Sequence, residues 1–273
     1  MSRLLILFAV LFSLNSFASD GSSVSQSSSV MDQVYLSYFG TFNGPGLMNL
    51  DNPNALNANG SLTDHKTAFG HINFDSEVTA AYLITPTIGV GPVIPFIFFP
   101  TQGYGAILGD LGLKAFSKKF YTAPNLNVYA NIIFQVPTSD GSKLNEMDFA
   151  IKTTPNVRYM IPNSRYTVGA WTEAKAYLGV KDRAKAFKLY ADPYVNYQLS
   201  PAFSLNLGFE MEANHFANVD KALDFKMVKS DLQPGFIYMV TPKVFLNPFL
   251  QVFTTEKISL DRTALSATLT ASL

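Results

Sequence analysis

Apolar and polar side chains alternate one by one along several long stretches of this chain. From His71 to Ile84, one face carries His71, Asn73, Asp75, Glu77 and Thr79, and the other carries Ile72, Phe74, Val78, Ala80, Tyr82 and Ile84. The same alternation recurs from Met147 to Ile161, with Met147 among the apolar set, and from Phe187 to Leu199. A period of two residues predicts β-strands with one apolar and one polar face.

Three of these stretches end in the same way, at intervals of about 40 residues: Pro155-Asn-Val-Arg-Tyr159, Pro193-Tyr-Val-Asn-Tyr197 and Pro234-Gly-Phe-Ile-Tyr238. Each is followed within a few residues by a tight turn containing proline, and Tyr82 stands at the same distance before Thr85-Pro86. In transmembrane barrels, aromatic rings lie where lipid meets water, and short turns join the strands on one side of the membrane. The repeat therefore predicts hairpins of a membrane-spanning barrel.

The whole chain divides into twelve such segments: 31–42, 68–84, 88–99, 104–117, 125–137, 146–160, 166–179, 186–199, 203–215, 224–240, 244–254 and 257–273. The even number suits a bacterial single-chain barrel. Long connections around 43–67, 138–145, 180–185 and 216–223 are expected outside the cell, with both termini in the periplasm. The predicted fold class is all-β: a transmembrane antiparallel up-and-down β-barrel of about twelve strands. Prolines 92, 95, 155, 193, 234 and 248 are expected to mark bulges or local breaks in the strands.

A soluble β-sandwich or lipocalin-like barrel would also alternate. Soluble strands average five or six residues, whereas these segments run to twelve or more. A soluble barrel would also turn its charges outward, but here the face with the tyrosines is apolar. The membrane barrel is the better interpretation.

The N-terminus has the features of an export signal. Arg3 precedes the apolar stretch Leu4 to Leu14, and Ser16-Phe17-Ala18 offers small residues for cleavage. We expect residues 1–18 to be a signal peptide, 19–30 a flexible serine-rich periplasmic leader, and 31–273 the barrel. The predicted location is the outer membrane, with its lipid as a partner.

Composition narrows the chemistry. The chain has no cysteine, which excludes disulfides and thiolate chemistry. Without Arg3, 19 basic residues face 20 acidic ones, so no basic excess points to nucleic acid. None of the three histidines is followed two positions later by a serine, so the His-x-Ser spacing of a catalytic Ser–His pair is missing. We therefore expect no enzymatic activity and no cofactor or metal.

Two further segments carry a family resemblance. Gly109-Asp-Leu-Gly-Leu-Lys114, followed by the strand from Leu126 to Pro137-Thr-Ser-Asp140, is similar to a pattern in Gram-negative outer-membrane β-barrels of the phenol-degradation meta-pathway and related transporter families. Ser139 stands where that pattern has glycine. The resemblance implies passage of small hydrophobic or aromatic solutes.

The polar face gives the candidate functional residues. We expect two layers of inward charged residues, an acidic one at mid-height that also contains the cation Lys152, and a more basic one about two residues higher. The lower layer consists of Asp75, Glu77, Asp110, Lys152, Glu173, Asp192, Glu210 and Asp231. The upper layer consists of Lys175, Lys188, Lys229 and Glu212. Two interpretations stay open. The layers could select permeating solutes, or they could be paired charges that fill the barrel, with Lys152 opposite Glu173 and Glu212 opposite Lys229.

The opposite part of the wall is predicted to be apolar on its inner face, through Tyr35, Phe39, Val93, Ile97, Phe99, Phe245, Phe249 and Phe253. This stripe could suit a partly hydrophobic solute or could pack against a folded-in first loop. The function expected from the sequence is porin-like passive diffusion of small, partly hydrophobic solutes. The alternative is a closed structural or surface-binding barrel without transport.

Overall fold

The computed structural model describes residues 33–50, 72–100, 105–219, 221, 224–254 and 258–272. The expected signal peptide and leader lie outside these residues, as does His71. The strands are β1 (Val34–Asn43), β2 (Asn73–Leu83), β3 (Ile88–Phe99), β4 (Gly105–Leu108), β5 (Gly112–Ala123), β6 (Leu126–Gln135), β7 (Phe149–Thr153), β8 (Asn156–Met160), β9 (Tyr166–Leu178), β10 (Lys185–Ser200), β11 (Phe203–Phe216), β12 (Lys226–Thr241), β13 (Val244–Phe253) and β14 (Thr263–Ser272).

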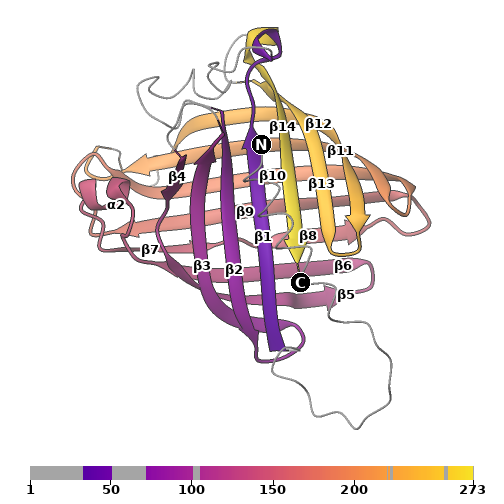
Figure 1. Cartoon of the computed structure of the whole chain (residues 1–273), viewed down its shortest axis with the longest axis horizontal. Helices are drawn as coiled ribbons and strands as arrows, with labels where there is room; N and C mark the ends of the chain where they lie inside the picture. The colour runs from indigo at the N-terminus through magenta and orange to yellow at the C-terminus, as the bar shows by residue number, and fades with distance from the viewer. Residues whose placement is uncertain are drawn as a thin grey trace.

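These strands form one closed antiparallel barrel (Figure 1). Each strand pairs with its neighbour in the chain, and the ring closes where β1 pairs with β14, from Ser37 opposite Ser272 to Phe42 opposite Ala267. β4 and β5 are two pieces of one barrel strand, and β7 and β8 are two pieces of another. The fourteen elements therefore make twelve barrel strands. The predicted twelve-stranded barrel is confirmed.

The two interrupted strands differ in register. At Thr154 and Pro155 the strand breaks between β7 and β8, yet both pieces keep one register against β6 and β9. Between β4 and β5 the register against β3 moves by one residue, and Gly109 N–H donates to Pro95 O at 2.8 Å. An extra residue in one strand is a β-bulge, which turns the following side chains to the other face.

The prolines behave differently from the prediction. Pro155 lies at a strand break and Pro95 lies opposite the bulge, but Pro92, Pro193, Pro234 and Pro248 lie within continuous strands. Pro193 stays in register with Ala170 of β9. Successive residues of an antiparallel strand bond to opposite neighbours, so one missing N–H weakens one ladder without shifting its register.

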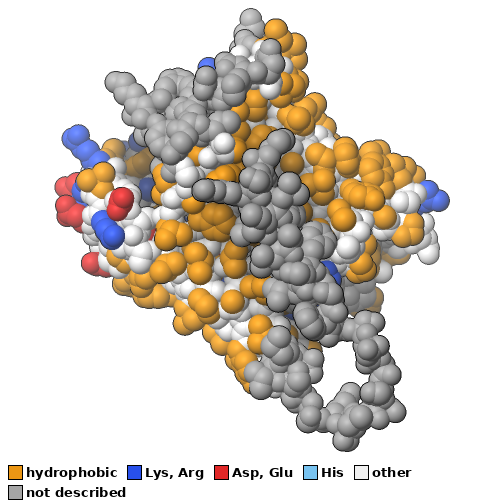
Figure 2. All heavy atoms as spheres, in the orientation of Figure 1, with side chains coloured by type: hydrophobic (Ala, Val, Ile, Leu, Met, Phe, Trp, Pro, Cys, Tyr) orange, Lys and Arg blue, Asp and Glu red, His pale blue; other side chains and the backbone are white. Residues whose placement is uncertain are grey.

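The outer face of the barrel is apolar. Figure 2 shows hydrophobic side chains spread over the visible strands, while charged ones gather mainly near α2 (Asp140–Leu144). The interface tyrosines Tyr82, Tyr159 and Tyr238 are exposed, and Tyr197 packs on Tyr166 with ring centroids 4.9 Å apart. Among the described residues, no helix is long and apolar enough to cross a bilayer.

Two residues expected on the outer face are buried instead. Ile72 is 8% exposed and Met147 is 4% exposed. Both precede the first residue of their strand, and Met147 N–H donates to Ser142 O in α2. The predicted alternation of outward and inward side chains was therefore extended to residues that lie before the strands begin.

Candidate functional site

A continuous series of ion pairs lines the inside of the barrel. It alternates in sign through Lys114, Glu77, Lys152, Glu173, Lys188, Glu212 and Lys185. The closest contact is 2.9 Å, from Lys114 Nζ to Glu77 Oε1, and the longest is 4.0 Å, from Lys152 Nζ to Glu173 Oε2. Because these residues come from six barrel strands, the series links distant parts of the wall through the lumen.

A second cluster joins β11, β12 and β13. Lys229 Nζ lies 2.5 Å from Glu210 Oε1 and 3.5 Å from Asp231 Oδ2. Gln233 donates to both carboxylates, at 2.6 Å and 2.7 Å, and Gln251 donates to Asp231 at 3.2 Å. The fully buried Asp231 thus has the partners that a buried charge requires.

Most of these charges remain accessible from the lumen. The ion-paired side chains other than Asp231 are between 12% (Glu210) and 34% (Lys185) exposed. In a barrel completely filled by side chains, the exposed fraction of these residues would be near zero. The charged part of the lumen therefore has room for water.

The expected pairings are partly confirmed. Lys152 pairs with Glu173 at 4.0 Å, as predicted, although the residue directly opposite Lys152 in the ladder is Lys175 rather than Glu173. Glu212 and Lys229 are opposite in the ladder, but Lys229 pairs with Glu210, and Glu212 pairs with Lys188 and Lys185. The reason is geometric: long side chains on twisted strands reach the diagonal neighbour two residues away as easily as the direct one.

Asp110 does not belong to the mid-height layer where it was expected. It lies in the bulge between β4 and β5, and its carboxylate accepts hydrogen bonds from Ser139 N–H at 3.0 Å and from Ser142 Oγ at 2.5 Å. Both partners belong to the first turn of α2 or its N-cap. Asp110 therefore anchors a connection between strands, because the bulge interrupts the alternation that would have pointed it inward.

Three other predicted residues face inward without an ion pair among the described part of the chain. Asp75 is exposed. Lys175 Nζ lies 4.6 Å from the centre of the Tyr177 ring. Asp192 has one buried oxygen, Oδ1, without a hydrogen-bond partner. All twelve candidate residues except Asp110 are thus on the inward face of a barrel strand.

The predicted apolar inner stripe is present. Val93, Phe99, Phe249 and Phe253 are at most 6% exposed. Lys229 Nζ lies 6.0 Å from the centre of the Phe253 ring, so the charged cluster and the apolar side adjoin. The lumen therefore has one packed apolar side and one wet, charged side.

Aromatic contacts also cross the lumen. Phe39 on β1 stacks with Trp171 on β9, with centroids 6.2 Å apart and planes at 14°. Tyr35 on β1 packs on Phe116 of β5 at 5.2 Å, with Lys118 Nζ 4.0 Å above the Tyr35 ring. The sequence interpretation overlooked Trp171, Lys114 and Lys185, although the first two share the parity of residues assigned inward.

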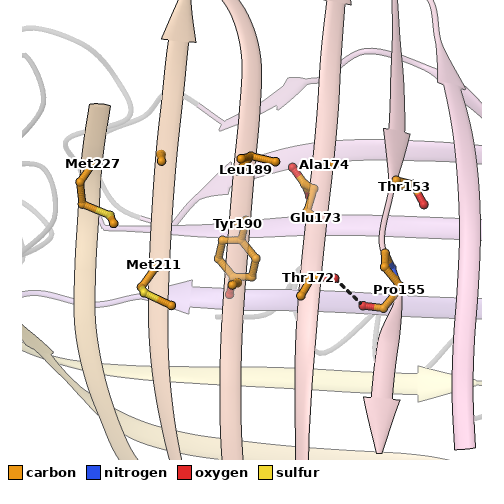
Figure 3. A pocket seen from close by; sticks show the side chains of 11 residues that line it. Thr153, Pro155, Thr172, Glu173, Ala174, Leu189, Tyr190, Met211 and Met227 are labelled. Carbon is orange, nitrogen blue, oxygen red and sulfur yellow. Dashed lines mark hydrogen bonds between the residues drawn. The ribbon is translucent and has the colours of Figure 1, made fainter. Parts of the chain in front are cut away.

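A hollow of about 400 Å³ interrupts the outer wall (Figure 3). It lies near the break at Pro155, whose carbonyl accepts from Thr172 Oγ1 at 3.2 Å. Its lining is mostly outward side chains, many of them small: Thr153, Thr172, Ala174, Ala191, Ala213, Leu189, Met211 and Met227. Such a surface depression suits packing of lipid tails rather than chemistry.

The comparisons with known proteins agree with this geometry. At the sequence level, neither a protein-family model nor a curated protein matches the chain. Among solved structures, an outer-membrane channel from Pseudomonas putida F1 is similar with a TM-score of 0.51 and 14% identity, over 88% of this chain and 95% of that one. The fold is that of an outer-membrane β-barrel.

Two further solved structures are more distant. The NanC porin has a TM-score of 0.44 and 7% identity, over 87% of this chain and 97% of that one. LpxR from Salmonella typhimurium has a TM-score of 0.43 and 10% identity, over 88% and 99%.

Proposed function

We propose that this protein resides in the outer membrane and forms a narrow, porin-like channel for passive diffusion of small solutes. The observation that carries the proposal is the accessibility of the inward charges, 12–34% for the ion-paired side chains other than Asp231. Twelve strands lie between the eight whose interior side chains can fill and the sixteen that leave an aqueous channel. For twelve strands we therefore expect a lumen that side chains fill only in part and that also contains water.

The lining supports small solutes with a polar and an apolar side. The ion-pair series presents carboxylates and ammonium groups, while Phe249 and Phe253 belong to the packed apolar side. A solute crossing the lumen could then hydrogen-bond to one side and contact the other. The exposed carboxylate of Asp75 adds a slight preference for cations.

A closed barrel is the alternative, and the cross-lumen contacts favour it. Lys152 bridges Glu77 and Glu173, and Phe39 touches Trp171. If these contacts persist in the membrane, the charged side chains only fill the interior of the barrel, and the protein has a structural or surface-binding role.

Single-channel recording in planar bilayers separates the two functions. We expect steady openings with modest K⁺ over Cl⁻ preference. Asp75→Asn should lower that preference with little effect on the fold, because Asp75 is exposed and belongs to none of the ion pairs found among the described residues. Asp140→Asn, on exposed α2, is the matched control. Silence at all voltages would instead support the closed barrel.

A further inference from the structure

Four lysines lie in one row across the inner wall. The ladder places Lys152 of β7 opposite Lys175 of β9, and Lys175 opposite Lys188 of β10. The row continues through Asn214 of β11, which lies opposite both Lys188 and Lys226 of β12. Like charges directly opposite each other destabilise a sheet, so stability alone does not explain a row of lysines without a carboxylate.

Carboxylates outside the row neutralise part of its charge. Lys152 and Lys188 share Glu173, at 4.0 Å and 3.3 Å. Each also contacts one further carboxylate, that of Glu77 and that of Glu212 respectively. These two lysines therefore belong to the ion-pair series already described.

Lys175 is oriented differently. It forms no ion pair within the described part of the chain, and its Nζ lies 4.6 Å from the centre of the Tyr177 ring. Tyr177 is the last inward residue of β9 before the strand ends at Leu178. The ammonium of Lys175 is therefore turned toward the end of the barrel that is expected outside the cell.

A hollow of about 440 Å³ lies at the Lys226 end of the row, and it is lined by Arg183, Phe216, Asn218, Val219 and Lys226. Lys226 Nζ lies 5.9 Å from the centre of the Phe216 ring. Asp182 accepts a hydrogen bond from Asn218 Nδ2 and is not part of the lining. Among the described residues, the lining thus has two cationic groups, an aromatic ring and no carboxylate.

The hollow is on the lumenal side of the wall. Met227, next to Lys226 along β12, lines the separate hollow of the outer wall, and so does Ala213 of β11. Successive side chains of a strand point to opposite faces. Lys226, one residue from Met227, and Phe216, three residues from Ala213, therefore point into the lumen.

We propose that this hollow binds small organic anions, with Arg183 and Lys226 holding a carboxylate or phosphate group beside Phe216. An arginine offers paired donors that match either group, and a lysine adds a compact positive charge. Phe216 and Val219 suit the apolar part of such a solute. The role of the site rests on the proposed channel, whose solutes it names, but binding itself does not require conduction.

The slight preference for inorganic cations proposed above has a different origin. Asp75 belongs to β2, and Glu210 and Asp231 surround Lys229. None of these carboxylates lines the hollow. An organic anion can therefore bind there while K⁺ remains the favoured inorganic ion in the rest of the lumen.

Saturation-transfer NMR on the folded protein in deuterated detergent can measure this binding, with butyrate as the probe and uncharged 1-butanol as its control. We expect binding of butyrate and little binding of 1-butanol. Arg183→Gln and Lys226→Gln should each lower butyrate affinity about three-fold, as expected for the loss of one exposed ion pair. The exposed residues Arg165, at the opposite turn, and Lys143, on α2, provide the matched controls Arg165→Gln and Lys143→Gln.

Lys175→Gln separates the hollow from the row. Three strand spacings separate β9 from β12, or about 14 Å, which exceeds the Debye length of about 8 Å at physiological ionic strength. The variant should therefore keep full butyrate affinity in physiological salt and lose affinity only at low salt. A loss equal to that of Arg183→Gln in physiological salt would place the anion at Lys175 and overturn the assignment to the hollow.

Two other results would overturn the proposal. One is equal binding of 1-butanol and butyrate, and the other is butyrate affinity of Arg183→Gln and Lys226→Gln equal to that of the controls. Lipopolysaccharide also carries phosphates, so the titration is repeated in vesicles with and without it. Unchanged butyrate affinity supports a site for solutes in the lumen, whereas displacement by lipopolysaccharide would assign the site to lipid and contradict the proposal.

Conduction is tested separately in planar bilayers. Silent bilayers together with charge-dependent butyrate binding would reject the channel and keep the anion site. Steady openings without butyrate binding would reject the anion site and keep the channel.

Discussion

Lys152 Nζ lies 3.4 Å from Glu77 Oε2, although β3, β4/β5 and β6 separate their strands in the ring. The pair therefore ties two parts of the wall together through the lumen, as hydrogen bonds along the ladder cannot. Lys152 also reaches Glu173, so one ammonium holds two carboxylates.

Lys152→Gln should destabilise the barrel. It leaves Glu77 with Lys114 and Glu173 with Lys188, but removes the link between the two halves of the series. Removing one partner of a deeply buried pair costs several kcal/mol, and the water around Lys152 reduces this to about 1–2 kcal/mol. Urea unfolding followed by heat-modifiable gel mobility measures the loss. Unchanged stability, equal to that of Lys143→Gln on α2, would mean that the pair contributes nothing.

Asp110→Ala should loosen the connection that contains α2, without affecting the rest of the barrel. The carboxylate accepts from Ser139 N–H and Ser142 Oγ, and charge-assisted hydrogen bonds of this kind contribute about 1–3 kcal/mol. Hydrogen exchange should accelerate at residues 139–145 and stay unchanged in β10 and β11. Equal protection in this segment would show that other contacts hold it.

Gly169→Ala should be more costly than its size suggests. A Cβ at Gly169 would stand 2.4 Å from Val157 O and 2.5 Å from the Tyr194 hydroxyl, so either the β8–β9 ladder or the tyrosine must move. Overpacking of this kind costs about 1–3 kcal/mol. Gly141→Ala is the matched control, because a Cβ there meets nothing within 4 Å and alanine favours the helix. Thermal unfolding should rank Gly169→Ala clearly below Gly141→Ala, and the opposite order would contradict the close approach.

Much of this fold could be predicted because membrane strands obey a strict period. The parity of Glu77, Lys152 and Glu173 followed from alternation alone, and so did the apolar inner face of Phe249 and Phe253. Trp171 has the parity of Glu173, so its inward direction was available in the sequence. Its contact with Phe39 was not, since no local pattern reports which strands face each other across a narrowed barrel.

The errors have local physical causes. Asp110 departs from its expected layer because one bulge residue changes the parity of a strand, and nothing in Gly109-Asp-Leu-Gly112 states how many residues the bulge takes. The choice of Lys229 between Glu210 and Glu212 depends on strand twist, which alternation does not contain. Prolines within continuous strands were misjudged because a missing donor need not shift a register.

The assignment of lipid-facing and lumenal faces can be tested with lysine. Val157 and Val195 are 40% and 42% exposed on the outer face, two residues deeper in the membrane than Tyr159 and Tyr197. A lysine facing lipid costs about 2–4 kcal/mol at the midplane and less toward the interface. Val157→Lys and Val195→Lys should therefore lower the yield of folded barrel in lipid vesicles.

The inward neighbours Asn156 and Asn196 provide matched controls one residue away on the same strands. Asn196 accepts from Asn206 Nδ2 at 2.7 Å inside the barrel, so lysine at either position meets water and polar groups rather than lipid. Asn156→Lys and Asn196→Lys should assemble nearly as well as the natural chain. If lysine is tolerated at the two valines but prevents assembly at the two asparagines, the assignment of the lipid-facing and lumenal faces is reversed. That result would also contradict the outer-membrane location.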